Sequence, residues 1–329
     1  MICAPLALTL GDPDGIGPEI TLKAWRDLRD EAHCFALTGD PDQAYAAALA
    51  LDLPRPEPVT SWREARDVFA DALPVIALPA AQGPRAALAS IEAGVQAVLS
   101  GEAFGLVTNP VSKARLYEAG FQFPGHTEYL AHLTAEAPVQ GPRGPVMMLA
   151  GGGLRCALVT IHQPLREAIA ALTPERIIET ARVTAHALKL DFAIEHPRLA
   201  LAGLNPHAGE GGALGREEID ILAPALDVLR AEGLAIAGPM APDTMFHAEA
   251  RERYDAAVCL YHDQGLIPVK TLDFHGGVNV TLGLPIVRAS PDHGTAFDIA
   301  GKGVARPDSL IAAIRLASDM AANRLRAQS

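Results

Sequence analysis

The chain has 329 residues, 49% of them hydrophobic, which is enough to bury one large core or two moderate ones. Its formal net charge of −12 argues against a nucleic-acid partner, and an anionic substrate would need a local cluster of cations. No apolar run approaches the roughly 18 residues of a membrane span. No basic region precedes the apolar start, and the cysteines lie far apart, so we expect a cytoplasmic protein with reduced thiols.

Short apolar runs alternate with longer amphipathic stretches along the whole chain, a pattern typical of βα units. The expected strands, in chain order, are Leu6–Leu10, Cys34–Thr38, Val75–Leu78, Gly105–Thr108, Val146–Leu149, Cys156–Ile161, Arg198–Leu204 and Ala256–Tyr261. The expected helices are Pro18–Arg29, Asp42–Leu51, Pro84–Leu99, Pro174–Leu190, Glu217–Ala231 and Pro307–Arg326. The Pro-rich stretch Leu53–Val59 is predicted to be a surface loop. The pattern predicts an α/β fold with a largely parallel or mixed sheet.

Three of the eleven histidines follow predicted strands: His162, His207 after Asn205-Pro206, and His262 before Asp263. Ligands gather beyond the carboxyl ends of strands in such sheets, and three neutral imidazoles can hold a metal while leaving coordination positions open. A single strand-end histidine is more often a hydrogen-bonding residue, but three equivalent placements favour a shared metal site. We interpret His33, His132, His186 and His196 as structural and leave His247 and His275 undecided.

The glycine-rich turns are less specific. Gly11–Glu19 opens a helix, but Ile20 takes the place of the third glycine of a dinucleotide fingerprint, so a tight structural turn explains it equally well. Asn205–Gly212 is predicted to be a flexible loop that carries a ligand candidate. Ser290–Gly303 is a polar loop that could cradle a cofactor, and a glycine-punctuated helix entry is the alternative. In the segment Gly125–Glu128, His126 is either a residue near a helix N-terminus or a substrate contact, and the sequence spacing alone allows both.

Together these segments resemble the family of 4-hydroxythreonine-4-phosphate dehydrogenases of pyridoxal phosphate biosynthesis. The matching stretches run in order over nearly the whole chain: Gly11–Glu19, Val107–Lys113, Gly125–Leu130, Thr160–Pro164, Leu204–Glu218, Asp243–Phe246, His262–Lys270 and Arg288–Gly303. The loop His293–Gly303 is also similar to the cofactor loop of isocitrate and isopropylmalate dehydrogenases, which bind nicotinamide dinucleotides without a Rossmann fingerprint.

The resemblance implies a two-domain architecture like that of isocitrate and isopropylmalate dehydrogenases, with an active-site cleft between the domains. Residues 1–122 and 280–329 are expected to form the domain with the chain termini and the cofactor loop. Residues 123–279 are expected to form the domain with the metal ligands and the interface of a homodimer.

The resemblance also implies roles for individual residues. A divalent ion, zinc first and magnesium or cobalt as alternatives, would be held by His162, His207 and His262, with the third histidine supplied by the partner subunit. The implied substrate contacts are His126, Thr127, Lys270, Asn279 and Arg288. The implied contacts to NAD, or NADP, are His293, Gly294, Thr295, Asp298 and Gly301. Asp243, Asp263 and Lys270 are alternatives for the catalytic base.

The implied activity is oxidation of 4-hydroxythreonine 4-phosphate at C3, followed by decarboxylation to 3-amino-2-oxopropyl phosphate. A sister dehydrogenase acting on 4-phosphothreonate, 4-phosphoerythronate or an aromatic cis-dihydrodiol acid is the nearest alternative. A zinc hydrolase and a non-catalytic metal-binding module are more distant ones. One departure is visible: Asp14 stands where the family commonly has a small residue, and this bears on cofactor or substrate preference.

Overall fold

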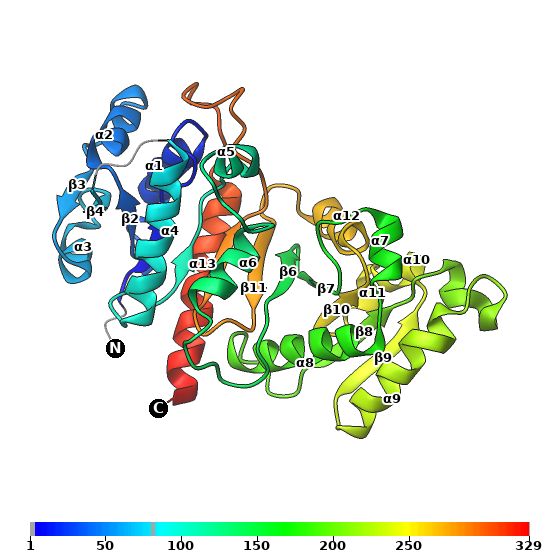
Figure 1. Ribbon diagram of the computed structural model, residues 1–329. Helices are drawn as coiled ribbons and strands as arrows, with labels where there is room; N and C mark the ends of the chain where they lie inside the picture. The colour runs from blue at the N-terminus through cyan, green and yellow to red at the C-terminus, as the bar shows by residue number, and fades with distance from the viewer. Residues whose placement is uncertain (1–3, 80–82, 329) are drawn as a thin grey trace. The chain divides into compact units, whose positions relative to one another are not determined.

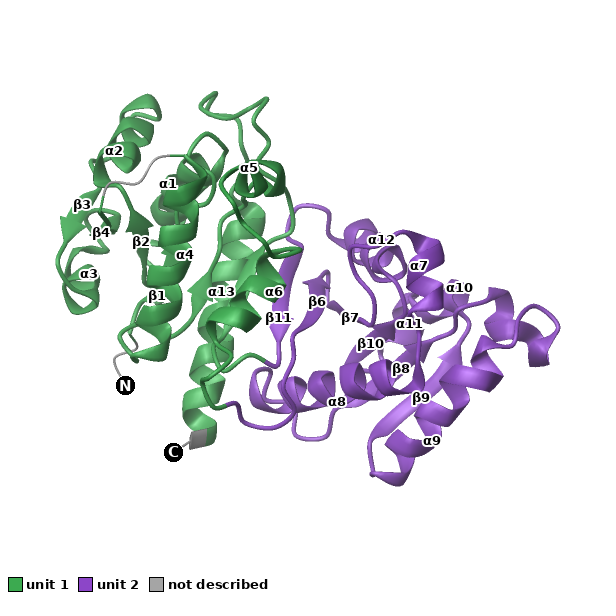
Figure 2. Ribbon diagram, viewed as in Figure 1, with its two compact units in different colours: residues 1–138, 284–329 green, residues 139–283 purple. Residues whose placement is uncertain are grey.

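The computed structural model describes residues 4–79 and 83–328 and divides the chain into two compact units (Figures 1 and 2). Unit 1 comprises residues 1–138 and 284–329, and unit 2 comprises residues 139–283. The α/β fold expected from the sequence is confirmed. Within the described residues, no helix has the length and apolar character needed to cross a membrane.

The strands of unit 1 are all parallel and run in the order β3-β4-β2-β1-β5-β12. They are β1 (Leu6–Thr9), β2 (Phe35–Gly39), β3 (Glu57–Val59), β4 (Pro74–Ala77), β5 (Leu106–Val107) and β12 (Arg288–Pro291). The helices are α1 (Gly17–Leu28), α2 (Pro41–Ala50), α3 (Trp62–Val68), α4 (Pro84–Leu99), α5 (Lys113–Glu118), α6 (His126–Leu133) and α13 (Asp308–Gln328). The segment Leu53–Val59, expected to be a loop, therefore ends in the edge strand β3, which pairs with β4.

Helix α6 explains why the first unit extends further than expected. Tyr129 and Leu130 of α6 are buried in the same hydrophobic cluster as Ile91 and Val95 of α4 and Leu106 of β5. Burial of these side chains stabilises α6 on the unit 1 core. Residues 123–138 therefore belong to unit 1, whereas the sequence prediction assigned them to the second domain.

The strands of unit 2 form a mixed arrangement in the order β11-β6-β7-β10-β8-β9, antiparallel on either side of β6 and parallel from β7 onward. They are β6 (Val146–Gly151), β7 (Leu154–Leu158), β8 (Arg198–Ala202), β9 (Ala235–Met240), β10 (Ala256–Cys259) and β11 (Val278–Leu282). The helical segments are α7 (Leu165–Ala170), α8 (Pro174–Leu190), η1 (Pro206–Gly212), η2 (Glu218–Leu222), α9 (Ala223–Ala231), α10 (Pro242–Met245), α11 (Ala248–Arg251) and α12 (His262–Leu272).

Both faces of the parallel strands β7, β10 and β8 are largely buried, whereas the edge strand β9 is partly exposed. Leu199 and Leu201 of β8 pack in a cluster with α8 and α9, while Ala200 and Ala202 pack in a second cluster with Val269 of α12. Side chains alternate between the two faces of a strand, so the apolar run of β8 serves both clusters. This burial fixes where each parallel strand ends and therefore where the polar residues that follow it lie.

The three described cysteines, Cys34, Cys156 and Cys259, are free thiols, and Cys3 lies outside the described residues. Burial raises the pKa of Cys34 to about 12, against a weaker opposing effect of Arg66. The thiol of Cys34 is therefore protonated at neutral pH and is a poor nucleophile.

Candidate active site

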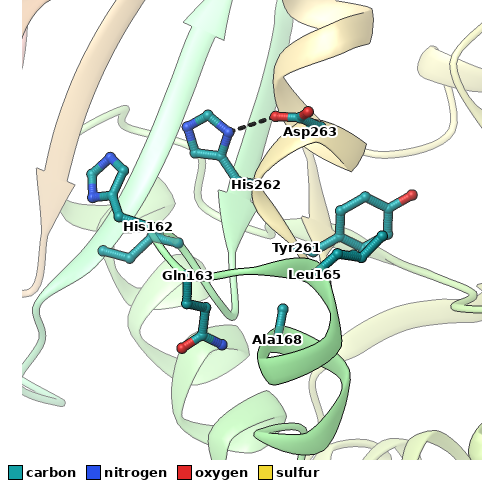
Figure 3. A pocket seen from close by; sticks show the side chains of 8 residues that line it. His162, Gln163, Leu165, Ala168, Tyr261, His262 and Asp263 are labelled. Atoms are coloured by element: carbon teal, nitrogen blue, oxygen red, sulfur yellow. Dashed lines mark hydrogen bonds and ion pairs between the residues drawn. The ribbon is translucent and has the colours of Figure 1, made fainter.

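His162 and His262 lie close together in unit 2. His162 follows β7 and His262 begins α12 after β10, and these neighbouring strands are parallel, with Leu158 paired to Cys259. The two imidazole rings lie side by side, with centroids 5.6 Å apart and planes inclined by 46° (Figure 3). They border a cavity of about 240 Å³ that is also lined by Gln163, Leu165, Ala168 and Tyr261. The strand-end placement predicted from the sequence thus brings these two histidines together.

Asp263 orients one of these rings. Its Oδ1 lies 2.7 Å from His262 Nδ1 (Figure 3). A carboxylate only accepts hydrogen bonds, so the proton is on Nδ1 and the lone pair is on Nε2. Metal-binding histidines commonly have such a carboxylate on the other ring nitrogen, because it fixes the tautomer and the ring orientation. Asp263 therefore suits a positioning role better than that of a free base.

His207 lies in a turn of unusual backbone conformation. Residues 207–211 all have positive φ, with values of 53° at His207, 52° at Ala208 and 45° at Glu210. The left-handed conformation costs an L-residue about 1–2 kcal/mol, so a run of it persists only where the surroundings impose it. Strain of this kind concentrates at functional sites, and the side chain of His207 is exposed.

Glu218 holds this turn in place, a role that sequence reasoning missed. Its Oε1 accepts hydrogen bonds from the backbone N–H groups of Leu204 (2.8 Å) and Asn205 (2.7 Å), and its Oε2 accepts one from the Asn205 side chain. Burial works to raise the pKa of Glu218, but these hydrogen bonds outweigh it and lower the pKa. Gly209 is needed beside it, because a Cβ there would lie 2.7 Å from Glu218 Oε2. Glu217 and Glu218 stand at the start of a helical segment, where acidic residues are common because they interact favourably with the helix dipole. Nothing in the sequence therefore showed that Glu218 is the buried one.

The three candidate metal ligands do not assemble within one chain. Across residues 4–79 and 83–328, no group of three His, Cys, Asp or Glu side chains is arranged to hold a metal ion. The donor set that is present, two neighbouring imidazoles with one ring oriented by a carboxylate, nevertheless fits a divalent transition metal that takes further ligands from elsewhere.

The other candidates of unit 2 lie on three different elements. Asp243 is exposed on α10, a helix that contacts the His207 turn. Lys270 lies in the last turn of α12, with its Nζ 5.6 Å from the ring centroid of Phe274. Asn279 lies on β11 opposite Leu149, and its Oδ1 is buried without a hydrogen-bond partner among the described residues. An orphaned buried acceptor of this kind indicates a missing ligand or water.

Unit 1 places His126, Thr127 and Arg288 among its own residues. His126 and Thr127 begin α6, and His126 Nε2 is buried without a hydrogen-bond partner among the described residues. Burial, with further contributions from the cations Arg288 and Lys113, lowers the pKa of His126 to about 3. His126 is therefore neutral at physiological pH, and its ring can bond an anionic ligand only through a neutral N–H.

Arg288 is the buried cation of this group. Its side chain is 2% exposed and donates a 2.7 Å hydrogen bond to Thr108 Oγ1, and burial lowers its pKa to about 10. The guanidinium stays charged at neutral pH. Lys113, the first residue of α5, is a second cation in this region, and sequence reasoning did not single it out although it lies in a matching stretch. Together these side chains provide the local positive charge that a protein of net charge −12 needs to hold an anion.

The expected cofactor loop is tied to α1 at both ends. Near its start, Thr295 O accepts a 3.0 Å hydrogen bond from Ile16 N–H. Near its end, Glu19 accepts from the N–H groups of Gly303 and Ala305, and Lys23 donates to their carbonyl oxygens. The exposed His293 and Gly294 come just before the first anchor. Between the anchors lie the exposed Asp298 and Gly301, whose φ of 72° suits glycine. The loop therefore presents polar groups on a fixed backbone, as a dinucleotide site requires.

Asp14, the departure noted in the first loop, binds Arg115. Arg115 donates to Asp12 Oδ1 at 2.6 Å and to Asp14 Oδ2 at 2.5 Å, and its guanidinium carbon lies 5.6 Å from the ring centroid of Phe297. Asp12 is buried and Asp14 is exposed. The extra carboxylate thus helps to hold an arginine beside the cofactor loop.

Comparisons with known proteins support one family. The family model described as "Pyridoxal phosphate biosynthetic protein PdxA" matches residues 31–317. A 4-hydroxythreonine-4-phosphate dehydrogenase of Caulobacter vibrioides is 58% identical over 335 residues, covering 98% of this chain and 99% of the relative. The crystal structure of the Klebsiella pneumoniae 4-hydroxythreonine-4-phosphate dehydrogenase superposes with a TM-score of 0.84 at 36% identity, covering 97% and 98% of the two chains.

A terephthalate 1,2-cis-dihydrodiol dehydrogenase of Burkholderia xenovorans is more distant, with a TM-score of 0.64 at 32% identity and coverage of 96% and 98%. The family model covers most of the chain, and the relatives match it over nearly their whole length. The chain therefore belongs to the PdxA family of pyridoxal phosphate biosynthetic proteins.

Proposed function

We propose that the chain is an NAD(P)-dependent, divalent-metal-dependent dehydrogenase. It would oxidise 4-hydroxythreonine 4-phosphate at C3 and decarboxylate the product to 3-amino-2-oxopropyl phosphate, a step of pyridoxal phosphate biosynthesis. The observation that carries the proposal is the pair His162 and His262, 5.6 Å apart at neighbouring strand ends, with Asp263 bound to one ring. Family membership supports the substrate, because the curated relatives carry its name.

We assign the metal to His162 and His262 of one subunit and to the partner subunit's His207. This changes the pairing expected from the resemblance, since His162 and His262 are the two that lie together in one chain. Zinc suits the imidazole donors best. When bound, the metal would act as a Lewis acid on the C3 oxygen, and the dinucleotide would accept the hydride.

The residues of the chain then have separate tasks. Neutral His126, with Thr127 and Arg288, would bind an anionic group of the substrate, as would Lys270 and Asn279. Asp263 would hold the His262 tautomer, which leaves Asp243 and Lys270 as candidates to take the proton of the C3 hydroxyl. The loop residues His293, Gly294, Thr295, Asp298 and Gly301 would hold the dinucleotide on the backbone fixed by Glu19 and Ile16.

The first test measures metal content and NADH formation with 4-hydroxythreonine 4-phosphate. His162→Ala and His262→Ala should each lose the metal and at least about 10³-fold in activity, since the ligands act as one unit. His196→Ala, an exposed histidine elsewhere in unit 2, is the matched control and should keep both. Full activity in the His162→Ala variant would refute the metal assignment.

Subunit mixing tests the sharing of the site. If His207 is the residue contributed by the partner, mixed dimers of His162→Ala and His207→Ala contain one complete site. Equal mixing should then restore about a quarter of the wild-type activity, because about half of the dimers are mixed and each has one intact site of two. Mixed dimers of His162→Ala and His262→Ala contain no complete site and should stay inactive. Recovery in the second mixture but not in the first would show that His262 is the partner's ligand.

A sister activity is the second candidate. The likeness to the terephthalate cis-dihydrodiol dehydrogenase supports an aromatic dihydrodiol acid as substrate, and phosphorylated threonate or erythronate are further alternatives. Lys270 and Arg288 favour phosphorylated substrates over the aromatic diol. Rates of NAD reduction with each compound would rank them, and a higher kcat/KM with the diol would displace the first proposal.

A further inference from the structure

A cavity of about 410 Å³ lies in unit 1 against the end of the expected cofactor loop. Its walls are the entry and first turn of α1, one face of α2 and the loop residues Ala300 and Gly301. The α2 face contributes Ala46, Ala47 and Ala50, which give the cavity a smooth apolar side. A flat ring can pack against such a surface, because small side chains leave room for close contact.

Gln43 is the uncharged polar side chain among the residues that line this cavity. Its Oε1 is buried and has no hydrogen-bond partner within residues 4–79 and 83–328. A side-chain amide carries both a donor and an acceptor, and it can pair with the edge of an adenine, which also presents both. A buried amide oxygen without a partner is uncommon in a folded protein.

The charge of the cavity restricts what it can take. Asp14 and Glu19 line it, and there is no Lys or Arg among its lining residues. Glu19 is already used by the loop N–H groups and Lys23, and Asp14 is bound to Arg115. A phosphate group here would meet two carboxylates and no free cation, whereas a ribose hydroxyl could donate a hydrogen bond to Asp14.

Resting on the proposed function, we propose that this cavity binds the adenosine half of the nicotinamide dinucleotide and that Asp14 makes the protein select NAD over NADP. Gln43 bonds the adenine edge, and the alanines of α2 pack against the ring. Asp14 lies near the ribose 2′ position, where it accepts from the hydroxyl of NAD and repels the 2′-phosphate of NADP. By binding Arg115 it also keeps that guanidinium from pairing with the 2′-phosphate.

Titration calorimetry of both dinucleotides against the purified protein, with no substrate present, tests the proposal. The wild type should bind NAD at least about tenfold more tightly than NADP, from like-charge repulsion. Asp14→Asn should bind NADP about tenfold more tightly than the wild type and NAD a few-fold more weakly, because the repulsion is removed and Arg115, still bound to Asp12, loses its second carboxylate partner. Asp14→Asn combined with Arg115→Gln should lose most of the gain for NADP.

Gln43→Ala should weaken both dinucleotides equally, by about five- to tenfold, since the adenine is common to both. Asp42→Asn removes a carboxylate from the same helix outside the cavity and is the matched control, with unchanged affinities. Thermal unfolding of each variant checks that it is folded.

The outcomes separate the two proposals. Unchanged selectivity in folded Asp14→Asn overturns the role of Asp14, and unchanged affinities in Gln43→Ala overturn the adenosine site. NAD binding with the expected selectivity but without oxidation of the phosphorylated substrate would overturn only the proposed function. A wild type that binds neither dinucleotide would overturn both.

Discussion

The two glycine-rich loops, one in each unit, have different structures. In unit 2, five consecutive left-handed residues put His207 on a strained turn that Glu218 holds from one side. In unit 1, the loop from His293 to Gly303 uses left-handed φ at Ala296, Gly301 and Gly303 only, and α1 binds it at both ends. The first loop has three non-glycine residues in the left-handed region, His207, Ala208 and Glu210, whereas the second has one, Ala296. Backbone strain is therefore concentrated around the candidate metal ligand more than in the expected cofactor loop.

Replacing His207 by glycine should have the largest effect, because it removes both the backbone strain and the imidazole. Glycine adopts positive φ without steric strain, so the strained turn would relax and the free energy of unfolding should stay the same or rise by about 1 kcal/mol. The imidazole is lost, however, so activity should fall by at least about 10³-fold and metal content should fall with it. Thermal unfolding and metal analysis check this. A clear loss of stability without loss of metal would show that the turn serves the fold and not the site.

Glu218→Ala should release the turn itself. Three hydrogen bonds to one buried carboxylate would be lost, and the free energy of unfolding should fall by about 3 kcal/mol. Metal affinity should fall by about 10- to 100-fold, because a partner that orients a ligand is removed. Asp220→Asn, two residues away on the exposed surface, is the control and should change little. Equal metal affinity in the Glu218→Ala variant would argue that His207 is placed without it.

Glu19→Gln should loosen the other loop to a smaller extent. The amide keeps an acceptor for one of the two loop N–H groups but weakens the pairing with Lys23, so unfolding should become easier by about 1–2 kcal/mol. KM for the dinucleotide should rise about three- to tenfold while metal content stays unchanged. A loss of metal in this variant would contradict the separation of the two loops.

The pH dependence of stability should report the burial of His126. His126 has a folded pKa of about 3, lowered mainly by burial, whereas an unfolded histidine has a pKa near about 6.5. Between pH about 6.5 and 3, His126 is protonated in the unfolded state but neutral in the folded state. The free energy of unfolding therefore falls as the pH falls through this range, by up to about 1.4 kcal/mol per pH unit. His126→Asn should flatten this part of the stability profile, as followed by urea unfolding.

Local pattern predicted eight of the strands, including those that precede the candidate metal ligands. The apolar runs before His162 and His262 predicted β7 and β10, and parallel pairing of neighbouring strands then brought the two histidines together. The strands β3, β9, β11 and β12 were missed, because their sequences contain Gly, Pro or polar residues and they form by pairing with neighbours. The sequence also did not predict that residues 123–138 belong to unit 1. Helix α6 joins this unit by packing on α4, and no motif within α6 indicates that packing.

By itself, the sequence determined the α/β class, the strands before His162 and His262 and the family, since these depend on periodicity and on motifs along the chain. Only the tertiary structure decided which carboxylate holds which loop. Glu218 and Glu19 look like ordinary first-turn residues of helices, and their roles arise from burial beside backbone N–H groups distant in sequence. Glu218 and the Leu204 N–H that it binds are 14 residues apart in the chain, and Glu19 and the Ala305 N–H are 286 apart. Only packing of the chain brings such partners together, so the local sequence does not predict these hydrogen bonds.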